Sequence, residues 1–154
     1  MKICIRQEVL TLGDYFDITD ENGEILYTGE QELFRFWKTI IVRDREEQEI
    51  VSIRHKFSLF FPCYEILSGE EKIGEIVREY SFLGSYYTVE GTGLTVDGSA
   101  FGHSYEIMRG EETVGHIEKE WLTFGDCYTL SFEEETDLPV MLAVLLAIDS
   151  MNES

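Results

Sequence analysis

The chain has 154 residues, of which 44% are hydrophobic and 13% aromatic, so we expect one folded domain spanning residues 1–154. Thirty-one acidic residues against twelve basic ones give a formal net charge of −19. A field of that sign repels nucleic-acid phosphates and anionic lipid surfaces, which excludes a general nucleic-acid-binding role.

The cysteine content and the hydropathy of the chain suggest the cellular compartment in which the protein is found. Cys4, Cys63 and Cys127 are too few and too widely spaced for a disulfide framework or a structural zinc site. The amino terminus becomes polar too early for a signal peptide, and no apolar run reaches the roughly 20 residues of a membrane span. We therefore expect a cytoplasmic protein with no cofactor and no stable insertion into a membrane.

Six copies of a seven-residue pattern recur along the chain. Each has apolar residues at its fifth and seventh positions with a different residue between them, the alternation of a half-buried strand. The fifth positions, residues 16, 40, 64, 87, 105 and 128, are separated by 24, 24, 23, 18 and 23 residues. This regularity predicts a fold of repeated hairpins. The copies are Leu12–Ile18, Phe36–Val42, Phe60–Ile66, Leu83–Val89, Phe101–Ile107 and Phe124–Leu130.

A turn and a second apolar segment follow each of the first five copies. The turns are expected at residues 20–24, 45–48, 68–71, 90–93 and 109–112. Asp20, Asn22 and Glu24 in the first resemble part of a calcium loop, but an EF-hand loop needs about twelve residues. The Asn-Gly pair there is typical of a tight hairpin, so we interpret the segment as a turn. With further strands near Ile3–Val9 and Cys127–Phe132, the chain has about twelve strands.

The segment from Leu138 to Ile148 contains no charged or hydrogen-bonding side chain. A helix that is apolar on every side must be enclosed on every side. Thr136 or Asp137 can cap its start, and Pro139 suits the first turn. We expect a buried central helix whose core-forming residues are Leu138, Pro139, Val140, Met141, Leu142, Val144, Leu145, Leu146 and Ile148.

These two features predict a mainly β fold, in which a closed antiparallel barrel of about twelve strands encloses the carboxy-terminal helix. Closure removes exposed sheet edges, and a barrel of this size has a lumen that a helix can fill. Asp149 follows the apolar run near the helix end, where a negative charge opposes the helix dipole. We expect the helix to emerge into solvent there; the alternative is a carboxyl group that accepts hydrogen bonds from the barrel rim.

The repeats, the segment Phe101–Tyr105 and the terminal segment Leu145–Asp149 resemble the LURP-one-related family, including bacterial members of the YxjI type. That family lies in the tubby C-terminal-like superfamily, which is related to the phospholipid scramblases. The resemblance covers the whole chain and implies a twelve-stranded barrel around a central helix, with phosphoinositide-binding relatives. It does not carry over the scramblase cysteine cluster or calcium-binding segment, for which this chain has no matching residues.

Half of the basic residues lie within residues 35–56, a segment with a net charge of +2. They are Arg35, Lys38, Arg43, Arg45, Arg54 and Lys56. One hypothesis is a local patch that contacts an anion or a lipid head group. The alternative is that these side chains face solvent and pair with acidic neighbours across the strands.

No catalytic motif or metal-ligand spacing occurs in the sequence, so we expect a protein that is not an enzyme. The leading hypothesis is a non-catalytic binding or scaffold module that recognises a protein or a small ligand through loops at the barrel rim. The second is a peripheral phospholipid- or phosphoinositide-binding protein, which the net charge disfavours and the basic segment supports.

Overall fold

The computed structural model describes residues 2–6, 15–34, 37–57, 61–81, 84–98, 103–122, 125–133 and 138–152. Within these ranges the chain forms twelve strands followed by one helix, as predicted. They are β1 (Lys2–Arg6), β2 (Tyr15–Thr19), β3 (Ile25–Phe34), β4 (Trp37–Arg43), β5 (Glu49–Lys56), β6 (Cys63–Ser68), β7 (Glu71–Ser81), β8 (Gly84–Glu90), β9 (Leu94–Gly98), β10 (Ser104–Arg109), β11 (Glu112–Leu122), β12 (Gly125–Phe132) and α1 (Leu138–Asn152). Val9 and the capping candidates Thr136 and Asp137 lie outside the described residues.

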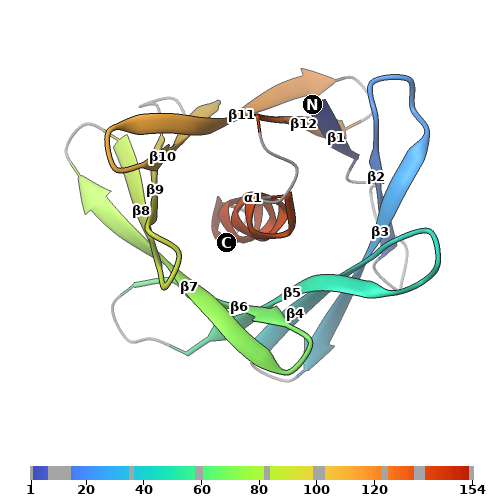
Figure 1. Cartoon of the computed structure of the whole chain (residues 1–154), viewed down its shortest axis with the longest axis horizontal. Helices are drawn as coiled ribbons and strands as arrows, with labels where there is room; N and C mark the ends of the chain where they lie inside the picture. The colour runs from blue at the N-terminus through green and yellow to red at the C-terminus, as the bar shows by residue number, and fades with distance from the viewer. Residues whose placement is uncertain are drawn as a thin grey trace.

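The strands close into a barrel. Each pairs antiparallel with its neighbours in sequence, and β1 pairs with β12. Figure 1 shows α1 inside the ring of strands. The predicted fold is therefore confirmed: a closed antiparallel barrel of twelve strands around a carboxy-terminal helix.

The repeated pattern builds the inner wall. The six copies correspond to β2, β4, β6, β8, β10 and β12, so alternate strands present equivalent residues to the helix. The seventh positions are at most 2% exposed, and the fifth positions are buried except for the partly buried Phe16. The seventh positions are Ile18, Val42, Ile66, Val89, Ile107 and Leu130.

The helix is enclosed along most of its length. Residues from Met141 to Ile148 are at most 4% exposed, and Leu138 is 8% exposed. Pro139 and Val140 are only partly buried, because they lie where the chain enters the barrel. In the described part of the chain, no helix is both long and apolar enough to cross a bilayer.

The two ends of the barrel differ. The tight turns within residues 20–24, 44–48, 69–70, 91–93 and 110–111 lie at one end, which we call the turn end. β12 ends there, so α1 begins at the turn end and runs toward the opposite end, which we call the mouth. The connection between β5 and β6 lies at the mouth, together with the carboxy terminus of α1.

The expectation that Asp149 emerges into solvent is wrong. Asp149 is 8% exposed, and its carboxyl Oδ1 accepts a hydrogen bond from the hydroxyl of Tyr128 in β12. The helix continues to Asn152, and Ser150 and Met151 are also buried. The barrel wall therefore extends past the apolar run, and the alternative, a hydrogen bond to the barrel, is the one the structure shows.

Two hairpin turns share one geometry, but the residue with positive φ at their fourth position is glycine in one and glutamate in the other. Asp20 and Asp44 each accept hydrogen bonds, through Oδ1, from the backbone N–H groups two and four residues later. This confirms that residues 20–24 form a turn. The fourth residue of the first turn is Gly23, with φ of 85°, whereas the second turn places Glu47 in the same region, with φ of 63°.

Glu47→Gly is expected to raise the free energy of unfolding by about 1 kcal/mol, because a side chain with positive φ is strained by about that amount. The melting temperature should rise by about 2–4 °C. Gly23→Glu, the reverse change in the equivalent turn, should lower it. Thermal denaturation checks both variants, and a lower melting temperature for Glu47→Gly would contradict the strain.

Candidate functional site

A row of polar side chains crosses the outer face of β3 to β7. In the strand register, Glu32 lies opposite Thr39, Thr39 opposite Arg54, and Arg54 opposite Glu65. Glu65 in turn lies opposite Glu75 in β7. These residues alternate with the buried ones that face α1, so the barrel wall itself holds them outward in a line.

An open groove of about 510 Å³ lies over part of this row. It runs toward the mouth, since it reaches the last residues of β5. Its lining residues are Glu32, Thr39, Arg54, His55, Lys56, Phe57 and Glu65. The groove therefore combines side chains of both charge signs with one exposed aromatic ring.

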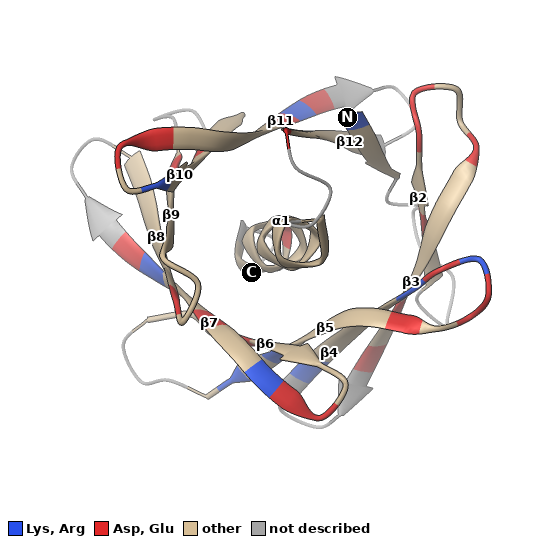
Figure 2. Ribbon diagram, in the orientation of Figure 1, with Lys and Arg blue, Asp and Glu red and all other residues tan. Residues whose placement is uncertain are grey.

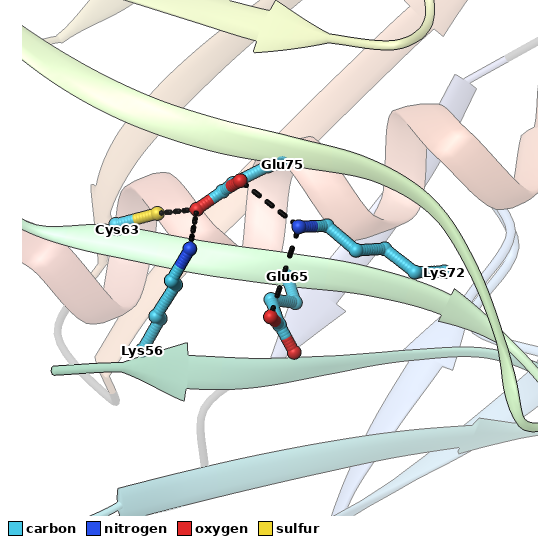
Figure 3. A network of polar contacts seen from close by, with 5 residues as sticks. All are labelled: Lys56, Cys63, Glu65, Lys72 and Glu75. Atoms are coloured by element: carbon cyan, nitrogen blue, oxygen red, sulfur yellow. Dashed lines mark hydrogen bonds and ion pairs between the residues drawn. The ribbon is translucent and has the colours of Figure 1, made fainter.

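The Glu75 carboxylate is the centre of a polar network beside the groove (Figure 3). Its Oε1 accepts hydrogen bonds from the Cys63 thiol at 2.8 Å and from the Lys56 ammonium at 3.1 Å. Its Oε2 accepts one from Lys72 at 3.0 Å. Lys72 also lies 3.7 Å from a carboxylate oxygen of Glu65. One carboxylate thus joins β5, β6 and β7 on the outer wall.

The network sets the protonation states of its members. The hydrogen bond from Cys63, followed by those from the two lysines, lowers the pKa of Glu75 to about 2 against the opposing effect of burial. Burial, together with the Glu75 carboxylate, raises the pKa of the Cys63 thiol to about 12. Because the thiolate is the nucleophilic form of cysteine, Cys63 is an inert hydrogen-bond donor at neutral pH.

Glu75→Gln is expected to lower the free energy of unfolding at pH 7 by on the order of 2 kcal/mol. The carboxyl group has a pKa of 4.5 when unperturbed and about 2 in the fold. Its contribution is therefore fully present above pH 4.5 and is lost as the pH falls toward 2. Urea denaturation at several pH values should show the difference between the two proteins shrinking over that interval.

Glu65→Gln is the matched control, because Glu65 faces outward on the adjacent strand, and its ion pair with Lys72 has the longer distance of 3.7 Å. An exposed ion pair of this kind contributes about 1 kcal/mol or less. If Glu65→Gln and Glu75→Gln lowered the free energy of unfolding equally, Glu75 would not be the centre of the network.

Three of the basic residues singled out in the sequence form ion pairs with glutamates. Arg43 pairs with Glu30, Arg45 with Glu24 at 3.9 Å, and Lys56 with Glu75. Arg54 makes no ion pair with any residue that the structure describes. Arg35 lies outside the described residues, and Lys38 lies on the inner face of β4, two residues from buried Ile40. Figure 2 shows basic and acidic residues interspersed along β3 to β7. The anion or lipid site stays a prediction.

Exposed aromatic rings mark the mouth beside the groove. Phe57 directly follows β5 and is 72% exposed, and Phe61 lies shortly before β6 and is 45% exposed. The sequence analysis did not identify them, because both lie among apolar residues that resemble the strand repeats. The exposure of Phe57 could have been inferred from its position, because it follows Lys56 at the point where the alternation of apolar and polar residues in β5 ends.

A second feature that the sequence analysis missed lies inside the mouth. His55, Arg78 and Lys119 each lie two residues beyond a buried isoleucine of the inner wall, on the mouth side. In register they lie opposite Tyr64, Tyr87 and Tyr128, which are buried. The His55 and Tyr64 rings are 5.1 Å apart, and the Lys119 ammonium lies 5.4 Å from the centre of the Tyr128 ring. The two-residue alternation could have indicated these inward positions.

In the part of the chain that the structure describes, no group of three or more histidine, cysteine or acidic residues is arranged to hold a metal ion. What the geometry offers is a mixed polar and aromatic surface at the mouth, suited to binding.

Comparison with known proteins gives consistent results. The model of the family described as LURP-one-related matches residues 1–149. YxjI, an uncharacterized protein of Bacillus subtilis strain 168, is 24% identical over 98 residues, which cover 64% of this chain and 60% of that relative. A protein of Arabidopsis thaliana solved by X-ray crystallography shares the fold, with a TM-score of 0.68 at 15% identity over 98% of this chain and 91% of that one.

Proposed function

The chain belongs to the LURP-one-related family, and we propose that it is a non-catalytic binding module that recognises a protein partner at the mouth of the barrel. The docking surface consists of Phe57, Phe61 and the groove that contains Arg54. The matched segment spans 60% of the length of the Bacillus relative.

The observation that carries the proposal is the pair of exposed phenylalanines at one connection. Among the described residues, the large hydrophobic side chains with the greatest exposure are Tyr15, Ile25, Phe57 and Phe61, and two of these four flank the connection between β5 and β6. Burying an exposed phenylalanine contributes about 1.5–3 kcal/mol. Protein interfaces typically use such aromatic anchors together with arginine. Arg54 lines the adjacent groove and makes no ion pair with the residues that the structure describes.

Charge favours a protein over a polyanion as the partner. The chain carries a net charge of −19, which slows its encounter with nucleic acids and anionic membranes. The groove itself contains Glu32 and Glu65 as well as Arg54 and Lys56. A protein surface can match both signs at once, whereas a uniformly anionic surface cannot.

Three features support a binding role in the cytoplasm rather than catalysis. The thiol of Cys63 is held protonated, with a pKa of about 12. Cys4, Cys63 and Cys127 are all free thiols, as is usual in a reducing compartment. The Glu75 carboxylate beside the Cys63 thiol has its pKa lowered to about 2, so it is too weak a base to activate that thiol, and its hydrogen bonds instead stabilise the wall.

The test compares proteins captured from cell lysate by the wild type and by Phe57→Ser/Phe61→Ser. We expect a partner that the wild type retains and the double variant loses. Ile25→Ser is the matched control, because Ile25 is 46% exposed but begins β3 near the turn end. The same captured proteins for all three chains would contradict docking at the mouth.

A peripheral lipid-binding role is the second candidate, as in tubby-like and scramblase relatives. It is favoured by the position of Arg54 and Lys56 beside the exposed ring of Phe57, since cations next to aromatic side chains suit the membrane interface. Flotation with liposomes containing anionic phospholipid or phosphoinositide tests it directly. Binding at low salt that Arg54→Gln weakens would favour this role over the first, and no flotation at low salt would exclude it.

A further inference from the structure

The outer groove holds two opposite charges that the polar network around Glu75 does not use. Of the charged residues that line the groove, Lys56 and Glu65 are held by ion pairs of that network. Glu32 and Arg54 are exposed, and neither makes an ion pair with any residue that the structure describes. The groove therefore presents one carboxylate and one guanidinium group to a binding partner.

The barrel wall fixes the spacing of these two charges. Glu32 in β3 and Arg54 in β5 both lie directly opposite Thr39 of β4 in the strand register. Because adjacent strands are about 4.8 Å apart, the Cα atoms of the two charged residues are separated by about 10 Å, with the partly buried Thr39 between them. Arg43, whose charge Glu32 also feels, is already bonded to Glu30, which lies nearer the turn end.

The exposed ring of Phe57 adds an apolar contact at a third position. Phe57 follows Arg54 by three residues, so its backbone lies about 10 Å further toward the mouth. The line from Glu32 to Arg54 runs across the strands, whereas the step from Arg54 to Phe57 runs along β5. The three groups therefore mark the corners of a triangle, which distinguishes one orientation of a bound chain from the reverse.

Two single charges of opposite sign select a partner by its pattern of charge. Arg54 favours a carboxylate, with which a guanidinium group can form two parallel hydrogen bonds, and Glu32 favours a lysine or arginine side chain. A uniformly anionic ligand would be repelled by Glu32, and a uniformly cationic one by Arg54. A polypeptide can carry both signs, since side chains two residues apart in an extended chain point the same way at a separation of about 7 Å. The long side chains of Glu32 and Arg54 can bridge the remaining difference.

We propose that the groove binds a mixed-charge protein segment, in which an acidic side chain pairs with Arg54, a basic one pairs with Glu32, and an apolar one packs on Phe57. This inference rests on the proposed function, because it specifies the chemistry of the partner at the same docking surface. The charge pair sets the register and orientation of the segment, and Phe57 supplies the apolar anchor.

The test selects binders from a phage-displayed library of random short peptides on the immobilised full chain. We expect the peptides that the wild type retains to share one acidic, one basic and one apolar residue at a constant spacing. Arg54→Gln should abolish only the enrichment of the acidic residue, and Glu32→Gln only that of the basic residue. Glu65→Gln is the matched control, because it changes a carboxylate of the same groove that is already ion-paired, and it should leave the selected pattern unchanged.

The affinity of one selected peptide, measured by isothermal titration calorimetry, checks the pairing with Arg54. Replacing the acidic residue of the peptide by its amide should weaken binding to the wild type about tenfold, the effect of losing a charge-assisted hydrogen bond. The same replacement should change binding to Arg54→Gln by less than about twofold, because the partner of that carboxylate is already gone.

The inference and the proposed function fail in different ways. If the peptides require Phe57 but their charges do not respond to Arg54→Gln and Glu32→Gln, the inference is overturned and the docking surface stands. If Phe57→Ser/Phe61→Ser selects the same peptides as the wild type, or if no peptide is enriched, both are overturned. Displacement of the peptide by phosphatidylcholine vesicles, whose head group also carries both charges, in a manner that requires Arg54 and Glu32 would assign the groove to a membrane surface and overturn the protein segment.

Discussion

Truncation of the chain at Glu135, which removes α1, is expected to leave no folded barrel. The residues from Met141 to Ile148 are almost fully enclosed, and the inner faces of the strands pack around them. Each large apolar side chain contributes about 1.5–3 kcal/mol on burial, so the helix as a whole rivals the typical net stability of about 5–15 kcal/mol. Circular dichroism and heat denaturation of the truncated chain check this.

A chain ending at Asn152 is the matched control, since it keeps all of α1. It should melt cooperatively near the temperature of the full chain. A truncation at Glu135 that remains soluble and also melts cooperatively would contradict the structural need for the helix.

Asp149→Ala is expected to lower the free energy of unfolding by about 2–3 kcal/mol, because it leaves the buried hydroxyl of Tyr128 without its acceptor. At about 2–4 °C per kcal/mol, the melting temperature should fall by roughly 5–10 °C. Asp149→Asn, whose amide oxygen can still accept the bond, should lose less. Thermal denaturation of both variants checks the prediction.

Tyr128→Phe removes the donor of the same bond and should have a comparable effect. The double variant Asp149→Ala/Tyr128→Phe should lose less than the sum of the two single losses, because groups in direct contact are not independent. Additive losses, or an unchanged melting temperature for Asp149→Ala, would contradict a stabilising bond between the helix and the wall.

The repeats predicted the barrel because they determine both the spacing of its strands along the chain and the residues that face its interior. The same sequence pattern gave the six even-numbered strands and identified the residues that meet the helix, such as Ile66 and Leu130. The run from Leu138 to Ile148 predicted an enclosed helix because it contains no polar side chain, so every face of the helix is apolar and must be kept from water.

The sequence did not predict which residues far apart in the chain would contact each other. The burial of Asp149 depends on how far the barrel wall extends past the apolar run, and hence on the position of Tyr128, which lies 21 residues earlier. Likewise, the basic segment contained residues of both faces, since Lys38 points inward and Arg54 outward. The network around Glu75 joins residues from three strands, which only the register between those strands brings together.

Amide hydrogen exchange of the full chain, followed by NMR, tests most directly the enclosure of α1 by the barrel. We predict that the amides of residues 142–148 are among the slowest in the protein and exchange only through global unfolding, because every side chain on that stretch is buried. Exchange of these amides faster than those of the strands, at a rate insensitive to the stability of the barrel, would show that the helix leaves the interior and would contradict the account.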